Sequence, residues 1–212
     1  MANELTLKKE HFSKIEGRFI ELTDQKTFAK ECSFAMQHFS KNDYLDKSTI
    51  ESKLQAVLNV AQVQLTLNPV LKLAYLVPRF ENGAVKCFLE PSYQGLVKLI
   101  TDTGSAKNVT CHPVYEGDIF DVTLGTSEDV VHNPKFKSKE IEYVYAIAVL
   151  SDGRKQIEVM TAEQVNEIRD KSESYKSFVA GKTKTCIWND HYGEMARKTV
   201  IKRLVKYLPK TE

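Results

Sequence analysis

The sequence lacks the patterns that mark membrane, secreted and zinc-bound proteins. Its four cysteines lie far apart with no C-x-x-C pair, which argues against a zinc ribbon or a disulfide framework and favours a reducing compartment. No apolar run approaches the roughly 20 residues that span a bilayer. The first residues, M-A-N-E-L-T-L-K-K-E, contain no apolar core of the kind that directs secretion. These absences predict a soluble, intracellular protein without a membrane partner.

Motifs of nucleotide-driven and metal-dependent enzymes are also missing. Neither G-x-x-x-x-G-K-[ST] nor G-x-G-x-x-G occurs, so ATP-driven work is not expected. The five histidines do not pair at metal-ligand spacing, since His112 precedes a proline, His132 begins H-N-P and His191 lies among basic residues. We therefore expect neither a metal centre nor a required cofactor.

One group of acidic residues leaves an enzymatic alternative open. Glu116, Asp118 and Asp121 stand close together in the sequence, and clustered carboxylates near a lysine can hold Mg²⁺ for phosphodiester hydrolysis. The same segment, E-G-D-I-F-D, is also typical of a strand entered through a Gly-Asp turn. A Mg²⁺-dependent nuclease is therefore an alternative to a binding protein.

The apolar pattern predicts helices at both ends of the chain and strands between them. Residues 24–40 have helical spacing, and Ser48 and Glu51 form a capping box (S-T-I-E) before a second helix. Residues 71–160 contain short β-rich runs, with Asn82-Gly83 and Asp152-Gly153 as type I′ hairpin turns. One helix, from residue 91 to 103 and closed by Gly104, interrupts these runs.

A second capping box, T-A-E-Q at residues 161–164, opens a further helix, and a polar loop then leads to a final basic helix. With 212 residues and 42% hydrophobic content, the chain is long enough for one domain with a substantial core. We expect the α+β class: a central antiparallel sheet with hairpins, flanked by N-terminal helices and a long basic C-terminal helix. The parts are residues 1–46 (helical), 47–165 (helix and sheet core) and 166–212 (basic loop and helix).

Positive charge is concentrated near the C-terminus. From Lys182 to Lys210 there are eight Lys or Arg and two acids, a net +6; because the whole chain carries +2, the rest carries −4. Such a basic segment in a mildly acidic protein predicts a polyanion partner at one place. If residues 188–209 form one helix, Lys198, Lys202 and Lys206 share one arc with Arg203 beside them, opposite an apolar stripe. A solvated helix face is the alternative interpretation of this lysine stripe.

Arg197 departs from the stripe. It falls in the arc between Leu204 and Leu208, where a guanidinium group needs a carboxylate, a phosphate or backbone carbonyls. A phosphate contact and a buried ion pair with a structural acid are both open interpretations.

Aromatic residues stand beside the basic ones. Trp188, the only tryptophan, lies one turn before Tyr192, and Tyr93 stands near Gln94 and Lys98. Stacking on such rings contributes about 1–3 kcal/mol per base in single-strand binders. The alternative for Trp188 is a hydrophobic anchor that holds the basic helix to the sheet.

Taken in order, these segments resemble the RecT family of phage single-strand annealing proteins, over residues from about 54 to 209. The resemblance is carried by the blocks T-L-N-P-V-L-K-L-A-Y-L-V-P-R, E-P-S-Y-Q-G-L-V-K-L-I-T-D-T-G, Y-E-G-D-I-F-D, V-V-H-N-P, Y-V-Y-A-I-A-V-L-S-D-G, I-E-V-M-T-A-E-Q-V and W-N-D-H-Y-G-E-M-A-R-K-T-V-I-K-R-L-V-K-Y-L-P. The W-x6-M-A-[RK]-K-T block is the most specific of them.

The resemblance implies ATP-independent binding of single-stranded DNA and annealing of complementary strands in recombination. It implies a homo-oligomer, as a ring or helical filament, that also holds the annealed duplex intermediate in the cytoplasm of a bacterial host. Remote kinship to Red beta and a Rad52-like core are implied too. A module that coats strands without pairing them is a further alternative, and screening of phosphate repulsion suggests that Mg²⁺ modulates annealing.

The family pattern also implies roles for single residues. Its basic pair falls on Arg197 and Lys198, and its next basic positions fall on Lys202 and Arg203. Arg197 is expected as a phosphate clamp or inter-strand pivot, and the lysines as phosphate contacts. The remaining candidates for nucleic-acid binding are Lys206, Lys182, Lys184, Lys98, Gln94, Tyr93 and Arg79.

Two departures from the family pattern weaken parts of this expectation. Gln94 stands where relatives often place a basic residue, so contacts from its helix are in doubt. Relatives also commonly continue past Y-L-P with a tail that docks an exonuclease or a host single-strand-binding protein, whereas this sequence ends at Glu212. Docking of these partners is therefore expected to be weak or missing.

Overall fold

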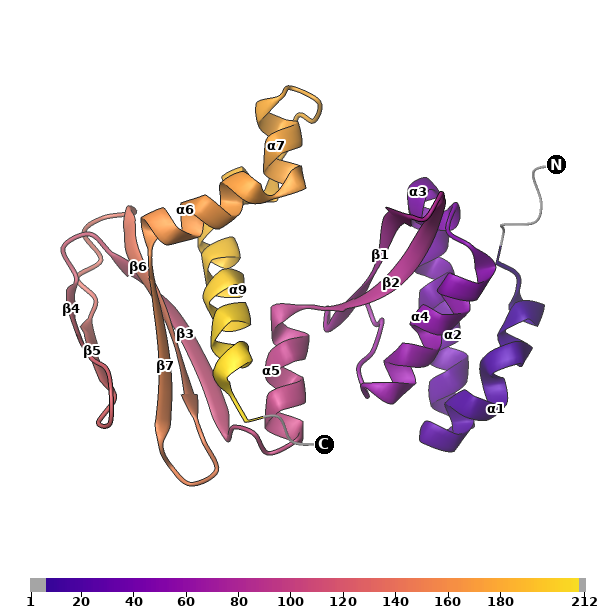
Figure 1. Ribbon diagram of the computed structural model, residues 1–212, viewed down its shortest axis with the longest axis horizontal. Coiled ribbons are helices and arrows are strands. Elements are labelled where there is room, and N and C mark those ends of the chain that lie inside the picture. The colour runs from indigo at the N-terminus through magenta and orange to yellow at the C-terminus, as the bar shows by residue number, and fades with distance from the viewer. Residues whose placement is uncertain (1–6, 210–212) are drawn as a thin grey trace. The chain divides into compact units, whose positions relative to one another are not determined.

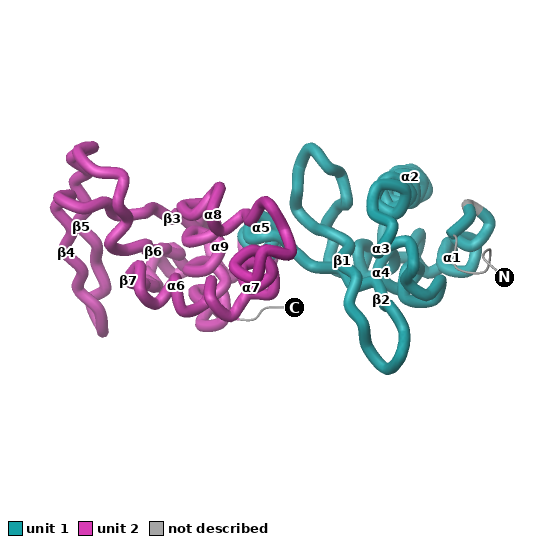
Figure 2. The backbone as a smooth tube through the Cα atoms, turned by 90° about the horizontal axis from the view of Figure 1, so that it is seen from above, with its two compact units in different colours: residues 1–99 teal, residues 100–212 magenta. Residues whose placement is uncertain are grey.

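The structure is a computed structural model that describes residues 7–209, and the chain divides into two compact units within one helix. Residues up to Leu99 form the first unit and residues from Ile100 form the second (Figures 1 and 2). The division falls inside α5 (Tyr93–Asp102) and coincides with neither of the boundaries drawn from the sequence, at residues 46/47 and 165/166.

The first unit is a helical cluster with one β-hairpin. Its helices are η1 (Lys9–Phe12), α1 (Ser13–Leu22), α2 (Gln25–Lys41), α3 (Asp43–Asp46) and α4 (Ile50–Gln62), and its strands are β1 (Ala74–Glu81) and β2 (Ala84–Pro91). Helix α4 carries the densest apolar face and packs against α1, α2 and β2. The expected N-terminal helices are confirmed. The N-cap of α4, however, is Thr49, whose hydroxyl accepts from Ser52 N at 3.3 Å, so the capping box expected at Ser48 is wrong by one residue.

The β1–β2 hairpin turns at Asn82-Gly83, as expected. Both residues have positive φ, 51° and 80°, which the type I′ turn requires. The hairpin leads into α5 through a close contact: a Cβ on Gly95 would lie 2.0 Å from the carbonyl oxygen of Leu73. Ser92 stabilises this contact between the hairpin and α5. Its N–H donates to Leu73 O at 2.8 Å, and its hydroxyl accepts from Gly95 N at 2.9 Å.

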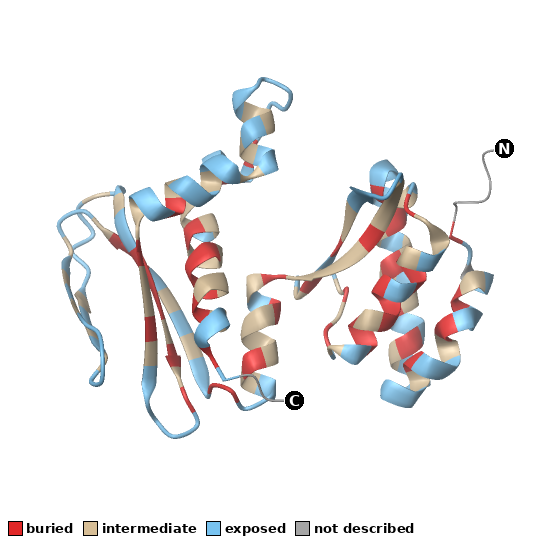
Figure 3. Ribbon diagram, viewed as in Figure 1, coloured by how far each residue is buried: buried red, intermediate tan, exposed pale blue. Residues whose placement is uncertain are grey.

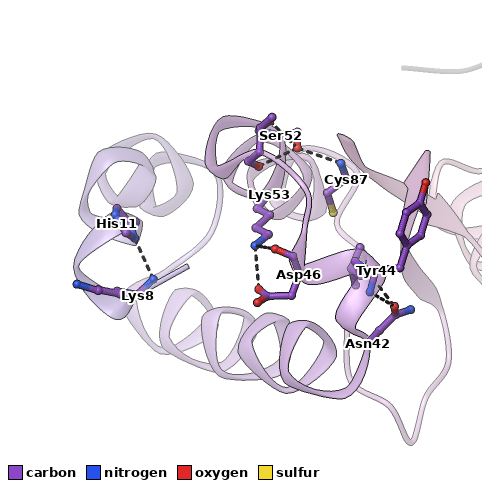
Figure 4. A network of polar contacts seen from close by, with 10 residues as sticks. Lys8, His11, Asn42, Tyr44, Asp46, Ser52, Lys53 and Cys87 are labelled. Carbon is purple, nitrogen blue, oxygen red and sulfur yellow. Dashed lines mark hydrogen bonds and ion pairs between the residues drawn. The ribbon is translucent and has the colours of Figure 1, made fainter. Parts of the chain in front are cut away.

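A buried lysine ties the short helix α3 to α4. The Lys53 side chain is fully buried, and its Nζ donates to Asp46 O at 2.6 Å and to Asp46 Oδ1 at 2.9 Å (Figure 4). The same ammonium group lies 5.1 Å from the ring centroid of Phe39 on α2. On the other side of α4, Ser52 Oγ accepts from Cys87 N at 2.9 Å and joins the helix to β2.

The second unit is a three-stranded antiparallel sheet covered by a helix. The strand order is β3–β6–β7, formed by β3 (Asn108–Tyr115), β6 (Ile141–Val149) and β7 (Lys155–Thr161); β4 (Ile119–Thr123) and β5 (Asp129–Asn133) make a separate hairpin. The helices are α6 (Ala162–Lys171), α7 (Glu173–Val179), α8 (Ile187–Asp190), α9 (Tyr192–Leu204) and η2 (Val205–Tyr207). Helix α9 packs along β6, β7 and β3, and its buried face is visible in Figure 3.

The core of the second unit lies between α9 and β6. Ala196, Val200 and Leu204 on α9 are fully buried, and so are Val144 and Ala146 on β6. Burial of such apolar surface contributes about 25 cal/mol per Å². The basic helix is therefore fixed to the sheet along most of its length, and its outer side chains project from a rigid support.

The α+β class is confirmed, but the single central sheet is not: the strands form three separate antiparallel sheets. The final basic helix is also interrupted. His191, with φ −140° and ψ 51°, separates α8 from α9, and the last turn is the 3₁₀ helix η2. The polar segment expected as a loop contains α7.

Two other local features differ from expectation, and one agrees with it. Residues 108–115, which form β3, were not among the runs expected as strands. Pro113 is compatible with β3 because β3 is an edge strand, where a missing N–H is tolerated. At Asp152-Gly153 only the glycine has positive φ, and Gly153 N donates to Leu150 O at 3.0 Å. The turn is therefore a type I turn followed by a left-handed glycine rather than type I′. The Thr161–Gln164 capping box is confirmed in both directions. Among residues 7–209, no helix has the length and apolar character needed to cross a membrane.

Candidate nucleic-acid interface

A groove runs beside α9, between this helix and the α6–α7 segment. We call it the α9 groove; its volume is about 480 Å³. Four basic side chains of α9 and η2 open onto it. The lining residues are Ile168, Ser172, Ser174, Trp188, Met195, Lys198, Thr199, Lys202, Arg203 and Lys206. No acidic side chain lines the groove, so the helical spacing of the basic residues does bring them together on one concave surface.

The basic residues of the α9 groove differ in how firmly the protein holds them. Arg203 Nε donates to Glu158 Oε1 on β7 at 2.7 Å, and the Glu158 side chain is only 13% exposed. Burial raises the pKa of Glu158, and the positive charge of Arg203 opposes that shift. Lys202 and Lys206, in contrast, have no ion-pair partner among the residues that the structure describes. Arg203 is thus bound to the sheet, while these two lysines are available to an anion.

Trp188 forms part of the groove wall as a buried anchor. It is 4% exposed and lies 6.5 Å, centroid to centroid, from the ring of Tyr192. The Tyr192 hydroxyl donates to Asn166 Oδ1 at 3.0 Å and approaches Ala162 O at 3.3 Å, and burial raises the Tyr192 pKa. Both rings are engaged within the protein, so stacking of either on a base requires that ring to leave its present contacts.

Arg197 opens onto a different cavity from that of its neighbour Lys198. This second cavity, the Arg197 pocket, has a volume of about 440 Å³ and is lined by His112, Pro113, Tyr115, His132, Pro134, Phe136, Tyr145 and Arg197. Arg197 Nη1 is paired with Glu194 on the preceding turn of α9. Its Nε is buried and has no hydrogen-bond partner in the described structure. The pair with Glu194 is not the buried ion pair of one interpretation, because the two side chains are 34% and 51% exposed, and it leaves a buried donor unsatisfied.

The other candidate residues lie outside both cavities. Lys182 and Lys184 are exposed in the loop between α7 and α8. Arg79, Tyr93, Gln94 and Lys98 belong to the first unit. Arg79 is paired there with Glu90 of the facing strand, and its guanidinium carbon lies 5.3 Å from the ring centroid of Phe88.

The three carboxylates of the nuclease alternative do not assemble. Asp118 accepts from Tyr115 N at 2.9 Å and from Lys135 N at 2.6 Å, and these hydrogen bonds hold its pKa below the usual range. Glu116 instead accepts from Ser138 Oγ at 3.3 Å, and Asp121 is exposed on β4. Within residues 7–209, no group of three His, Cys, Asp or Glu side chains is placed to hold a metal ion. Asp118 lies in the turn between β3 and β4 and there holds the loop after β5 through Lys135 N.

Sequence reasoning missed two parts of this region. The α7 part of the groove wall was assigned to a loop, although S-E-S-Y begins with a residue suited to an N-cap, and Ser172 does accept from Tyr175 N. The second is the segment Pro134–Lys139, P-K-F-K-S-K, which borders the Arg197 pocket. Its alternation of lysines with an aromatic residue was a signal for single-strand binding that could have been followed.

The fold and the α9 groove define an α+β protein with a basic groove that no acidic side chain of the described residues lines. Comparison with known proteins gives the family: the RecT family model matches residues 29–212, and the chain belongs to the RecT family. It is 34% identical over 163 residues to Protein RecT of Escherichia coli strain K12, covering 74% of this chain. It is 25% identical over 167 residues to the uncharacterized protein YqaK of Bacillus subtilis strain 168, covering 79% of this chain. The chain spans 58% and 54% of the lengths of these two relatives.

Proposed function

We propose that the chain binds single-stranded DNA and anneals complementary strands during recombination, without ATP. The observation that carries the proposal is the α9 groove, where four basic side chains meet and no acid lines the surface. Lysines hold phosphates as point charges and leave the base edges free to pair. Pairing of the strands itself releases the free energy of duplex formation, so no nucleotide needs to be hydrolysed.

The groove residues have distinct roles in this proposal. Lys198, Lys202 and Lys206 hold phosphates, and Arg203 positions α9 on the sheet through Glu158. The lysines are neighbours at i, i+4 and i+8 on a helix fixed to the sheet. Because each projects from the same rigid support, the groove meets the backbone of a strand without a sequence-specific contact.

The wider assembly is part of the same proposal. We infer a homo-oligomer, ring or filament, in which the basic surface continues from one subunit to the next around a Rad52-like core and also holds the annealed intermediate. Mg²⁺ would modulate annealing by screening phosphate repulsion. The protein would act in the cytoplasm of a bacterial host. Sedimentation of the protein with and without an oligonucleotide would test the oligomer.

The decisive experiment is annealing of two complementary oligonucleotides, monitored by fluorescence quenching without nucleotide. Both strands are then run on a denaturing gel. Rapid quenching with intact strands supports annealing. Tight binding of the strands without faster annealing would indicate a module that coats strands without pairing them. Shortened strands would indicate the nuclease alternative. Lys202→Ala should slow annealing, whereas Lys107→Ala, which removes an exposed lysine of the same unit outside the groove, should not.

A further inference from the structure

The loop between β5 and β6 presents an exposed aromatic ring among unpaired lysines. Lys135, Lys137 and Lys139 are all exposed, and none has an ion-pair partner among the described residues. Between them, Phe136 is 86% exposed. We call residues 134–139 the KFK loop. Single exposed apolar residues are ordinary on a protein surface, so this ring bears on function only together with its backbone and its neighbours.

The backbone of Phe136 is unusual as well. Its φ is +56°, in the left-handed region that non-glycine residues rarely adopt. Bulky residues in this region carry backbone strain, and such strain persists where surrounding structure holds it. Lys135 supplies that restraint, because its N–H donates to the buried Asp118 carboxylate at 2.6 Å. The backbone beside Phe136 is therefore tied to the turn between β3 and β4, which contains Asp118.

The KFK loop borders a cavity whose wall is preformed. Pro134 and Phe136 form one side of the Arg197 pocket, and Tyr145 and His132 line another. The Tyr145 ring stacks on Phe120 at 5.4 Å, and its hydroxyl lies 3.2 Å from His132 Nδ1. These contacts fix the inner wall of the pocket, where Tyr145 is only 6% exposed and the rings of His132 and Tyr145 meet edge-on at 80°. The ring that a base can reach is therefore the exposed one of Phe136.

The Arg197 pocket also contains a hydrogen-bond donor without an acceptor. Arg197 Nε is a buried donor without a partner, and such a group costs free energy until an acceptor reaches it. The pocket lining contains no acidic side chain. Glu194 meets the guanidinium group at Nη1, and Asp118 meets His132 at Nε2, 3.2 Å away, so both carboxylates are already engaged. The unfilled donor suits a phosphate or a base carbonyl oxygen.

We propose that the Arg197 pocket receives one nucleotide of a bound single strand. Its base lies against Phe136, an acceptor of the nucleotide meets Arg197 Nε, and the flanking phosphates meet the lysines of the KFK loop. This site rests on the proposed binding of single-stranded DNA and adds a second contact to it, since the α9 groove and the Arg197 pocket share no lining residue.

The proposal makes an uncommon prediction for Phe136→Gly. Glycine adopts φ +56° without strain, so thermal stability should stay the same or rise. Affinity for oligo(dT), measured by anisotropy, should nevertheless fall about tenfold, the loss of one stacked base. Its salt dependence should not change, because no charge is removed. Tyr44→Ala, which removes a 48% exposed aromatic ring from the first unit, is the control and should leave affinity unchanged.

A direct readout of stacking completes the test. In Phe136→Trp, titration with oligo(dT) should quench the new fluorescence, whereas the buried Trp188 of the parent protein should respond little. Parent affinity in Phe136→Gly together with unquenched fluorescence in Phe136→Trp would overturn the nucleotide site while leaving the proposed function intact. No binding of oligo(dT) by the parent protein would overturn both. Lower stability of Phe136→Gly would assign the ring to folding and would also reject the site.

Discussion

The lysines of the α9 groove give a prediction whose size follows from the structure. Lys198, Lys202 and Lys206 line one surface. If each neutralises one phosphate of a single strand, each contributes about 0.7 to the slope of log affinity against log salt. Alanine at all three positions should therefore lower the slope by about 2.1. Between about 50 and 200 mM salt, one such contact corresponds to about a 2.6-fold change in affinity, and three to about 18-fold.

Arg203 is the residue of the same groove with which the effect of the lysines can be compared. It lines the same groove but is already paired with Glu158. Arg203→Ala should change the salt slope less than Lys202→Ala does, and it should destabilise the protein because it leaves a nearly buried carboxylate without its partner. A merely electrostatic account of the groove, in which every positive charge acts alike, predicts equal effects from the two substitutions.

The assay is anisotropy of a labelled oligo(dT) at several salt concentrations, with thermal unfolding of each variant alongside it. Lys107→Ala serves as the control for loss of one positive charge outside the groove. The reasoning fails if the triple variant keeps the parent slope while remaining folded. It also fails if Lys107→Ala lowers the slope as much as Lys202→Ala, because binding would then follow net charge and not the groove.

Substitutions at three further positions test the support of the fold. Gly95→Ala places a methyl carbon 2.0 Å from Leu73 O and should cost at least about 1–3 kcal/mol in chemical unfolding; an unchanged midpoint would contradict the close contact. Lys53→Ala should cost about 3 kcal/mol, since it leaves Asp46 without its buried partner and opens a cavity, whereas Lys53→Met should cost less; equal losses would show that the charge is unimportant. Asp118 has a lowered pKa, so its stabilisation is present above the unfolded carboxyl pKa and is lost as pH falls through the folded value; Asp118→Asn should flatten stability against pH in that acidic range, and a profile identical to the parent would refute the assignment.

Local chemistry made some elements of the fold predictable. The Asn82-Gly83 turn and the Thr161–Gln164 capping box depend on residues within four positions of one another, and both are present. Strand β3 depends on its neighbours instead. Pro113 is compatible with this strand because β3 lies at the edge of the sheet. The local sequence does not determine which strand lies at an edge. The separation of the strands into three sheets is likewise set by long-range packing.

The site shows the same division between local and long-range information. Helical spacing was sufficient to place Lys198, Lys202 and Lys206 on one surface, although the helix is shorter than expected. The separation of Arg197 from Lys198 could not be predicted, because it depends on where β3 and the KFK loop approach α9. The positive φ of Phe136 was also hidden, since the hydrogen bond that restrains its neighbour Lys135 comes from Asp118, 17 positions earlier.

The availability of Lys202 and Lys206 follows from how the described part of the second unit uses its acids. Glu158 pairs with Arg203, Glu194 with Arg197, and Asp118 with the loop backbone and His132. Each of these carboxylates stabilises the scaffold, and none lies in the lining of the α9 groove. Glu158→Gln should therefore weaken the attachment of Arg203 without adding a phosphate site. Asp121→Asn removes one distant negative charge and is the control. If Glu158→Gln raised DNA affinity more than Asp121→Asn does, Arg203 would contact DNA. Its assignment as a support for α9 would then be wrong.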